Sequence, residues 1–208
     1  MAKAKETKQK YKGAFIVLPT FRCAFPNLFE PRAFEAENGA KGEPKYDITM
    51  LWPKKKEKEE LKLARLAVAK AAKERFGEKE DWPEELELPW RDGDEYEDLQ
   101  GFKGMRVLRA STLNPPGVVD QNKEEILEAK RIYGGCYCRA SVVFKAWEMG
   151  TQGKRGYRAG VTCYLQNVQL VAKGEKMGGG SNADDDFDVI ESDDDDTNSD
   201  DDDIDLGF

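Results

Sequence analysis

The sequence predicts a mainly β protein: a small five-stranded barrel with one covering helix and a disordered acidic tail. Three observations lead to this prediction. Several stretches alternate apolar and polar residues with period two, one long segment has helical spacing, and negative charge collects near the C-terminal end. Strand and helix patterns do not alternate along the chain, which argues against a doubly wound sheet.

Two alternating stretches lie in the first quarter of the chain. Residues 14–25 are predicted to form one long strand that ends at Pro26, with one face made of Phe15, Val17, Phe21, Cys23 and Phe25. The second strand covers residues 45–52, where Tyr46, Ile48, Met50 and Trp52 share a face. Because Trp52 shares that apolar face, both a core role and a base-stacking role remain open for it.

The predicted helix covers residues 54–76. This segment has no Gly or Pro, and its apolar positions recur at helical spacing: Leu61, Ala64, Val68, Ala72 and Phe76. Gly77 supplies the stop signal. The other positions are mostly Lys, Glu and Arg, so we expect the helix to cover one side or end of a sheet.

The remaining elements alternate with loops. Residues 78–98 hold 11 Asp or Glu against Lys79 and Arg91, and their Pro and Gly residues predict a loop that Trp82 and Trp90 anchor to the body. Strands are predicted over residues 105–112 and 117–120, a short helix over 122–131, and two long strands over 136–147 and 158–171. A Gly-rich turn joins the last two strands.

Charge divides the chain into three parts. Residues 1–12 are a basic segment that we expect to be mobile, residues 13–173 form the folded domain, and residues 174–208 are a Gly-rich linker and an acidic tail. Residues 181–208 carry 14 Asp or Glu and no Lys or Arg, whereas residues 1–180 have 27 acidic and 33 basic residues, a net charge of +6. A polyanionic partner suits the body, while the tail repels one.

The strand at 136–147 carries the strongest functional pattern. Its even positions are all apolar and predict the inward face. Its odd positions interleave aromatic and cationic side chains on the outward face, with Tyr137, Arg139, Lys145 and Trp147 as the informative ones. Single-stranded nucleic acid is bound by such a combination, because aromatic rings stack on bases and cations hold phosphates. The alternative is that these side chains only cover a sheet edge and face solvent.

Neighbouring segments favour the nucleic-acid interpretation. Lys154 and Arg155 lie in the Gly-rich turn, and Arg158 and Tyr164 point outward from the next strand, where Val161, Cys163 and Leu165 point inward. Arg106 and Arg109 fall on opposite faces of their strand, so we expect at most one of them to contribute. Trp82 and Trp90 lie among carboxylates and are assigned to packing.

Metal and enzyme chemistry find little support. Cys136 and Cys138 place two sulfurs on one face, but zinc needs two more ligands, the chain has no histidine, and Cys23 and Cys163 would have to join them. We therefore expect no cofactor and no metal.

Enzyme motifs are missing as well, both the phosphate-binding loop and the nucleophile motif of common enzymes. The charged residues Asp120, Lys123, Glu124 and Glu125 give only a faint indication of a metal-dependent nuclease, since such charge runs are usually solvated surface. A non-enzymatic protein is therefore predicted.

The acidic tail ends in apolar residues. After a long polar run come Ile204, Leu206 and Phe208, with Asp203 and Asp205 beside them. A simple solubility tail has no need of an aromatic residue there, whereas a docking peptide does. We therefore expect Asp203, Asp205, Leu206 and Phe208 to bind a protein partner.

The order of these parts resembles the single-stranded-DNA-binding proteins of bacteriophage replication systems. The resemblance rests on FRCAFPNLFEP, KYDITMLWP and YGGCYCRASVVFKAW with GVTCYLQNVQLV, and on the acidic tail with its phenylalanine. It covers most of residues 13–173 and the tail. It implies a Greek-key barrel of the OB type, base stacking on the barrel's concave face, and a tail that contacts replication proteins such as a DNA polymerase.

The predicted function is therefore sequence-tolerant binding of single-stranded DNA during replication and recombination, in the cytoplasm of an infected bacterial cell. The tail is expected to recruit replication proteins and to compete with DNA. The alternative is an interaction protein, chaperone-like or a DNA mimic, whose acidic tail binds basic partners. No segment approaches the roughly 20 apolar residues of a membrane span, so no membrane partner is expected. The sequence leaves open a homo-oligomer, the DNA or RNA preference and the site size.

Overall fold

The computed structural model describes residues 14–33, 39 and 41–178, which all belong to the first of two compact units, Met1–Gly178 and Gly179–Phe208. The described part is mainly β, as predicted, and holds nine strands. They are β1 (Ala14–Val17), β2 (Phe21–Arg32), β3 (Lys45–Pro53), β4 (Leu86–Glu87), β5 (Trp90–Asp92), β6 (Met105–Thr112), β7 (Gly117–Val119), β8 (Tyr137–Met149) and β9 (Arg158–Ala172).

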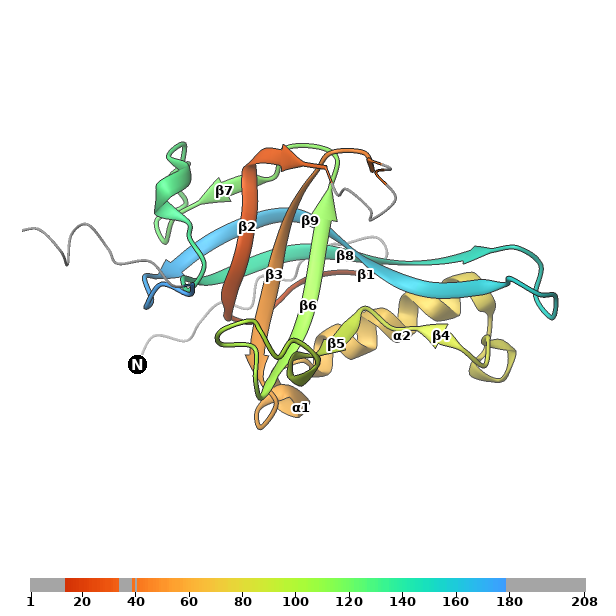
Figure 1. The fold of residues 1–208 in the computed structure, drawn as a ribbon. Helices are drawn as coiled ribbons and strands as arrows, with labels where there is room; N and C mark the ends of the chain where they lie inside the picture. The colour runs from red at the N-terminus through yellow and green to blue at the C-terminus, as the bar shows by residue number, and fades with distance from the viewer. Residues whose placement is uncertain (1–13, 34–38, 40, 179–208) are drawn as a thin grey trace, which may run out of the picture. The chain divides into compact units, whose positions relative to one another are not determined.

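Five of these strands close into the barrel. Their spatial order is β2, β3, β6, β9 and β8, and β8 pairs with β2 to complete the circle (Figure 1). All neighbouring pairs are antiparallel except β6 and β9, which run parallel at Ser111 and Tyr164. The short strands attach to this frame, because β1 extends the sheet beside β8, β4 and β7 pair with β9, and β5 pairs with β6.

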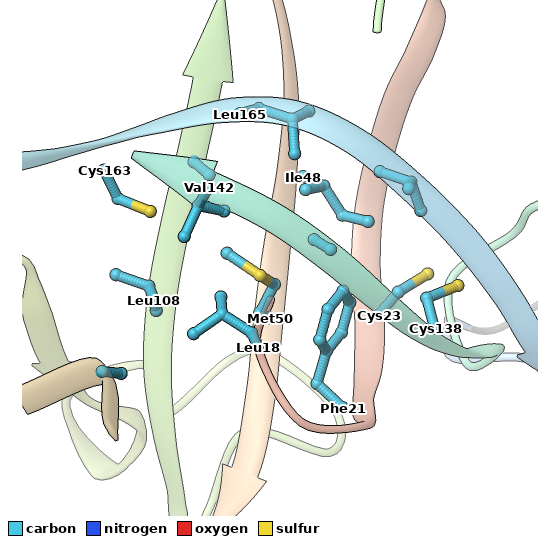
Figure 2. Packing of buried hydrophobic residues seen from close by; sticks show 14 of the residues in the cluster. Leu18, Phe21, Cys23, Ile48, Met50, Leu108, Cys138, Val142, Cys163 and Leu165 are labelled. Atoms are coloured by element: carbon cyan, nitrogen blue, oxygen red, sulfur yellow. The ribbon is translucent and has the colours of Figure 1, made fainter. Parts of the chain in front are cut away.

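The barrel interior is filled by alternate residues of the five strands. Figure 2 shows Ile48 and Met50 of β3, Leu108 of β6 and Val142 of β8 converging on one core. Trp52 is fully buried, and its ring meets the edge of Phe21 at a centroid distance of 5.4 Å. The open question about Trp52 is therefore decided in favour of packing.

The predicted helix is present but starts later and is divided. A turn precedes α1 (Glu57–Glu60), and α2 (Lys62–Phe76) follows after Leu61. The second helix packs against β1 and β8, and Ala64, Val68, Ala71 and Ala72 form its buried face. Gly77 has a φ of 91° and ends the helix, as predicted. Among the described residues, no helix is long and apolar enough to cross a membrane.

The prediction of one strand over residues 14–25 was wrong. The chain leaves the extended ladder at residues 18–20 around Pro19, and β2 then continues past Pro26 to Arg32. Proline is tolerated because the register between β2 and β3 shifts between Ala24 and Asn27, a bulge that leaves residues 25 and 26 outside the ladder. At the same place Phe25 adopts a φ of 47° and does not share the buried face of Phe21 and Cys23.

Two other local predictions need correction. Residues 122–131 contain only the short 3-10 helix η3 (Ala129–Arg131), because Asp120 accepts hydrogen bonds from the backbone N–H groups of Asn122 and Glu124 and fixes a tight turn there. The segment 78–98 is not all loop, since it includes β4, β5 and two 3-10 helices, η1 (Lys79–Asp81) and η2 (Gly93–Glu95). Trp82 and Trp90 do pack against the core, as expected.

Cys138 tests the inward face of β8. Its side chain is fully buried, so Cys138→Ala should cost about 1 kcal/mol of folding free energy and lower Tm by about 2–4 °C. The control Lys145→Ala changes an exposed side chain of the same strand and should leave Tm unchanged. Differential scanning calorimetry on both variants checks this, and equal Tm values for the two would contradict the assigned faces.

Candidate nucleic-acid interface

The two faces of β8 differ as predicted. Cys138, Ala140, Val142 and Phe144 are buried, while Tyr137, Arg139 and Lys145 are exposed and Trp147 is half-buried. The neighbouring β9 repeats the division, with Val161, Cys163 and Leu165 buried and Arg158 and Tyr164 exposed. The pairing shifts between Ser141 and Val142, where β9 has one extra residue: Gln166 and Asn167 are both exposed, and beyond them the buried positions of β9 are Val168 and Leu170.

Three of the predicted binding residues lie together on the outer face of the barrel. Lys145 and Tyr164 are on adjacent strands, and the ammonium of Lys145 lies 5.4 Å from the centre of the Tyr164 ring. Trp147 follows on the same face and lies opposite Gly160. A Cβ at Gly160 would come within 2.8 Å of the indole, so the glycine makes room for the ring.

Tyr137 and Arg139 lie at the other end of β8. Ten residues separate Tyr137 from Trp147, a distance of about 33 Å along a strand. The Tyr137 ring packs near Gly174, and Arg139 pairs in register with Gln169. The structure therefore does not bring these two residues into one local site with Lys145, Trp147 and Tyr164.

The remaining predicted cations lie on the β8–β9 hairpin, which extends beyond the barrel (Figure 1). Lys154 and Arg155 are exposed in its connecting turn. Arg158 is exposed too, but it forms an ion pair with Glu87 at 2.7 Å, so part of its charge is neutralised. Glu148 holds the turn end of the hairpin by accepting from Arg75 of α2 at 2.7 Å and from the Tyr157 hydroxyl at 2.9 Å.

A groove of about 940 Å³ lies next to the cluster of Lys145, Trp147 and Tyr164. Trp147 and Thr162 form one side of it, and Tyr164 lies two residues beyond Thr162 on the same face of β9. Strands β2, β3 and β6 contribute the rest of the barrel surface: Phe25, Asn27, Asp47, Thr49, Val107 and Arg109. Aromatic, polar and cationic side chains thus line one continuous surface that crosses the barrel strands.

The acidic segment 78–98 builds the opposite wall of this groove. Glu87, Leu88, Pro89, Arg91 and Tyr96 all line it. Lys54 fixes the segment by forming ion pairs with Asp92 and Asp94, and Asp94 also accepts from the backbone N–H of Gly104 at 2.6 Å. The hydrogen bonds from Lys54 lower the pKa of both carboxyl groups, and those carboxylates raise the pKa of Lys54.

Comparison with known proteins decides the family. The sequence model of the family described as Enterobacter phage Enc34, ssDNA-binding protein, matches residues 14–199. The chain belongs to this family. A curated relative, putative protein p50 of Acyrthosiphon pisum secondary endosymbiont phage 1, is 32% identical over 186 residues, which cover 83% of this chain and 92% of the relative.

Solved structures agree with the family assignment. The single-stranded DNA-binding protein from bacteriophage Enc34 in complex with ssDNA superposes with a TM-score of 0.61 at 27% identity, over 79% of this chain and 90% of that one. Its C-terminal truncation gives a TM-score of 0.60 at 27% identity, over 78% and 88% of the two chains. The single-stranded DNA binding protein gp2.5 of bacteriophage T7 shares the fold, with a TM-score of 0.54 at 15% identity over 86% and 96%. These neighbours confirm the OB-type fold.

Within this member of the Enc34 family, several groove residues were missed from the sequence. Phe25 was grouped with Phe21 and Cys23 on one face of the predicted strand, and Arg32 and Arg91 were not singled out, although Phe25 and both arginines line the groove. Arg109 was considered only as one of two alternatives; it lines the groove, whereas Arg106 donates to the carbonyl of Arg91 at 3.5 Å. For Arg91, the available signal was its position between Trp90 and Tyr96 in an otherwise acidic segment.

The cysteines of this family member do not form one ligand set. Figure 2 shows Cys23 and Cys138 next to each other and Cys163 on the far side of the core. All four thiols are buried, and burial raises the pKa of Cys163. Within the described ranges, no three Cys, Asp or Glu side chains gather in a way that would hold a metal ion. Asp203, Asp205, Leu206 and Phe208 lie outside the described residues.

Proposed function

We propose that this protein binds single-stranded DNA with little sequence preference and protects it during phage DNA replication and recombination. One observation carries the proposal: the groove and the face beside it combine exposed aromatic rings with cations on a rigid barrel. Every base has a π-face, so stacking on aromatic rings tolerates any sequence, and cations neutralise the phosphates between bases. Family membership and the Enc34 complex with ssDNA support the same function.

The roles divide by side-chain chemistry. Tyr164 and Trp147 stack on bases, and Lys145 binds phosphate beside them. The cation–π contact between Lys145 and Tyr164 places a phosphate-binding group directly beside a base-stacking group. Lys154, Arg155 and Arg158 extend the path along the hairpin, and Tyr137 with Arg139 extends it toward the other end of β8.

The tail has two roles in this proposal. Residues 181–208 carry 14 negative charges and compete with DNA for the cationic groove, and Asp203, Asp205, Leu206 and Phe208 bind replication proteins such as a DNA polymerase. DNA binding then releases the tail, so partners are recruited where single strands are exposed. The protein acts by binding and performs no catalysis.

Titration with oligo(dT), followed by tryptophan fluorescence, tests the central claim against duplex DNA of the same length. Quenching by oligo(dT) at lower concentration than by duplex is the expected result. Equal affinity for oligo(dT) and duplex DNA would contradict the proposed preference for single strands. Loss of binding to both forms would remove the proposed function itself.

Tyr164→Ala and Trp147→Ala should each weaken oligo(dT) binding by about 1–3 kcal/mol, the usual contribution of one stacked base. Tyr164→Phe is the matched control, because it keeps the ring and loses only the hydroxyl, and it should bind nearly as the parent does. Fluorescence anisotropy with labelled oligo(dT) gives the affinities and circular dichroism verifies folding. A folded Tyr164→Ala variant that binds oligo(dT) with the affinity of the parent would show that Tyr164 does not stack on a base.

A further inference from the structure

The backbone at Phe25 is unusual for its residue type. Among the described residues, only Phe25 and Lys123 have a positive φ without being glycine. Lys123 lies in a turn, but Phe25 lies within β2, where a φ of 47° is strained for a side chain with a Cβ. Such strain is found at ligand-binding positions, and here it turns an aromatic ring away from the buried side of β2.

The ring of Phe25 is fixed on one side and open on the other. Its centroid lies 5.9 Å from that of Phe102, a residue only 2% exposed, and Phe102 in turn packs on Tyr96 at 5.4 Å. Phe25 itself is 49% exposed and lines the groove. An aromatic side chain of this kind has little rotamer entropy to lose when a flat ligand stacks on it.

A buried carboxylate holds two polar groups beside this ring. Asp47 is 4% exposed and accepts from Asn27 Nδ2 at 2.7 Å and from Arg109 Nε at 2.7 Å, with a second ion-pair contact to Arg109 Nη2. The Arg109 side chain is 64% exposed, so its guanidinium reaches solvent while one edge stays fixed. Asp47 accepts from two of the five N–H groups of Arg109. The N–H groups on the outer edge of the guanidinium remain available to a ligand in the groove.

These residues lie on three adjacent strands. Phe25 and Asn27 are on β2, Asp47 is on β3 and Arg109 is on β6, and all four line the same groove as Trp147. Two strand spacings separate β2 from β6, a distance of about 10 Å. A base on Phe25 and its neighbouring phosphate at Arg109 therefore fit within one stretch of DNA backbone.

From this arrangement we propose a second base-binding subsite in which an unpaired base stacks on Phe25 and Arg109, positioned by Asp47, binds the adjoining phosphate. The inference rests on the proposed function and adds residues outside the pattern of β8 and β9. Because paired bases in a duplex do not offer a free face, this subsite selects single strands. Asp47 is a positioning residue and does not itself touch the DNA.

The first test changes the ring in the full chain. Phe25→Gly removes it and relieves the positive φ, so folding is preserved while oligo(dT) affinity falls about 5- to 100-fold. Phe25→Leu keeps apolar volume without a planar face and should lose affinity to a similar extent. Phe25→Tyr keeps the face and should bind within about twofold of the parent. Melting curves of all three variants accompany the anisotropy titrations.

The second test separates positioning from charge. Asp47→Asn removes a negative charge from the groove, so electrostatics alone predicts tighter DNA binding. A positioning role predicts the opposite, a loss of about threefold or more, because the charge-assisted hydrogen bonds that hold Arg109 are lost. Arg109→Ala should lower oligo(dT) affinity at least as much as Asp47→Asn does. The double variant should lose little more affinity than Arg109→Ala alone, because both changes remove the same phosphate contact.

The outcomes distinguish this inference from the proposed function. A parent chain that fails to bind oligo(dT) overturns both. A parent that binds, with Phe25→Gly and Phe25→Leu equal to it, overturns the Phe25 subsite and leaves the proposed function intact. Tighter binding by Asp47→Asn overturns the positioning role of Asp47.

Discussion

Oligo(dT) binding to residues 1–180 should weaken about a hundredfold when monovalent salt rises from about 50 to about 200 mM. The folded part and its basic N-terminal segment carry a net charge of +6. Each phosphate contact on a single strand contributes about −0.7 to the slope of log K against log[salt]. One contact from each of the five predicted cations therefore gives a slope of about −3.5; these are Arg139, Lys145, Lys154, Arg155 and Arg158. The measurement is anisotropy with labelled oligo(dT) at four or more salt concentrations.

Single substitutions give this prediction its control. Lys145→Ala should make the slope shallower by about one contact, uniformly across base sequences. Lys70→Ala removes the same charge from α2, where the ammonium lies 3.9 Å from Glu74, and should leave the slope unchanged. A binding constant that depends strongly on base identity and weakly on salt would contradict the proposed mode of binding.

Sequence reasoning succeeded where local alternation alone decides the structure. In β8 every second residue from Cys138 to Phe144 is apolar and buried, and a strand has only two faces, so the inward face could be assigned even though Val143 on the other face is apolar too. Val161, Cys163 and Leu165 of β9 are buried for the same reason. Gly77 also ended its helix as expected, because a positive φ favours glycine there.

The missed residues depend on information that a periodic pattern does not contain. The exposed ring of Phe25 follows from one backbone torsion at a bulge, and alternation along β2 assigns it to the wrong face. The wall formed by residues 87–91 depends on long-range pairing, because β4 adds in parallel to β9, more than 70 residues later in the chain. Asp47 is polar and buried, and its partners Asn27 on β2 and Arg109 on β6, which come from distant parts of the chain, explain that burial.

The acidic tail gives the second large effect. Deleting residues 181–208 should tighten oligo(dT) binding about a hundredfold at about 20 mM salt, and much less at about 200 mM, where charges beyond a shorter Debye length are screened. The tail of 28 residues holds 14 negative charges, and in the competition proposed above it spans about 30 Å, the root-mean-square length of a random coil of that size. The proposed competition therefore takes place at an effective tail concentration of about 1 mM.

The size of the effect follows from this concentration. Non-specific binding of a polyanion to a cationic protein surface has a Kd of about 10⁻⁴ to 10⁻⁶ M, and at 10⁻⁵ M the tail occupies the groove in about 99 of 100 molecules. In this case only about one molecule in 100 has a free groove, so the apparent DNA affinity of the full chain is about a hundredfold lower than that of the shortened chain. Phe208→Ala keeps all 14 charges, so DNA affinity should stay near that of the parent while capture of a replication protein is lost. Equal affinities of the full and shortened chains at low salt would refute the competition and leave the tail as a docking arm alone.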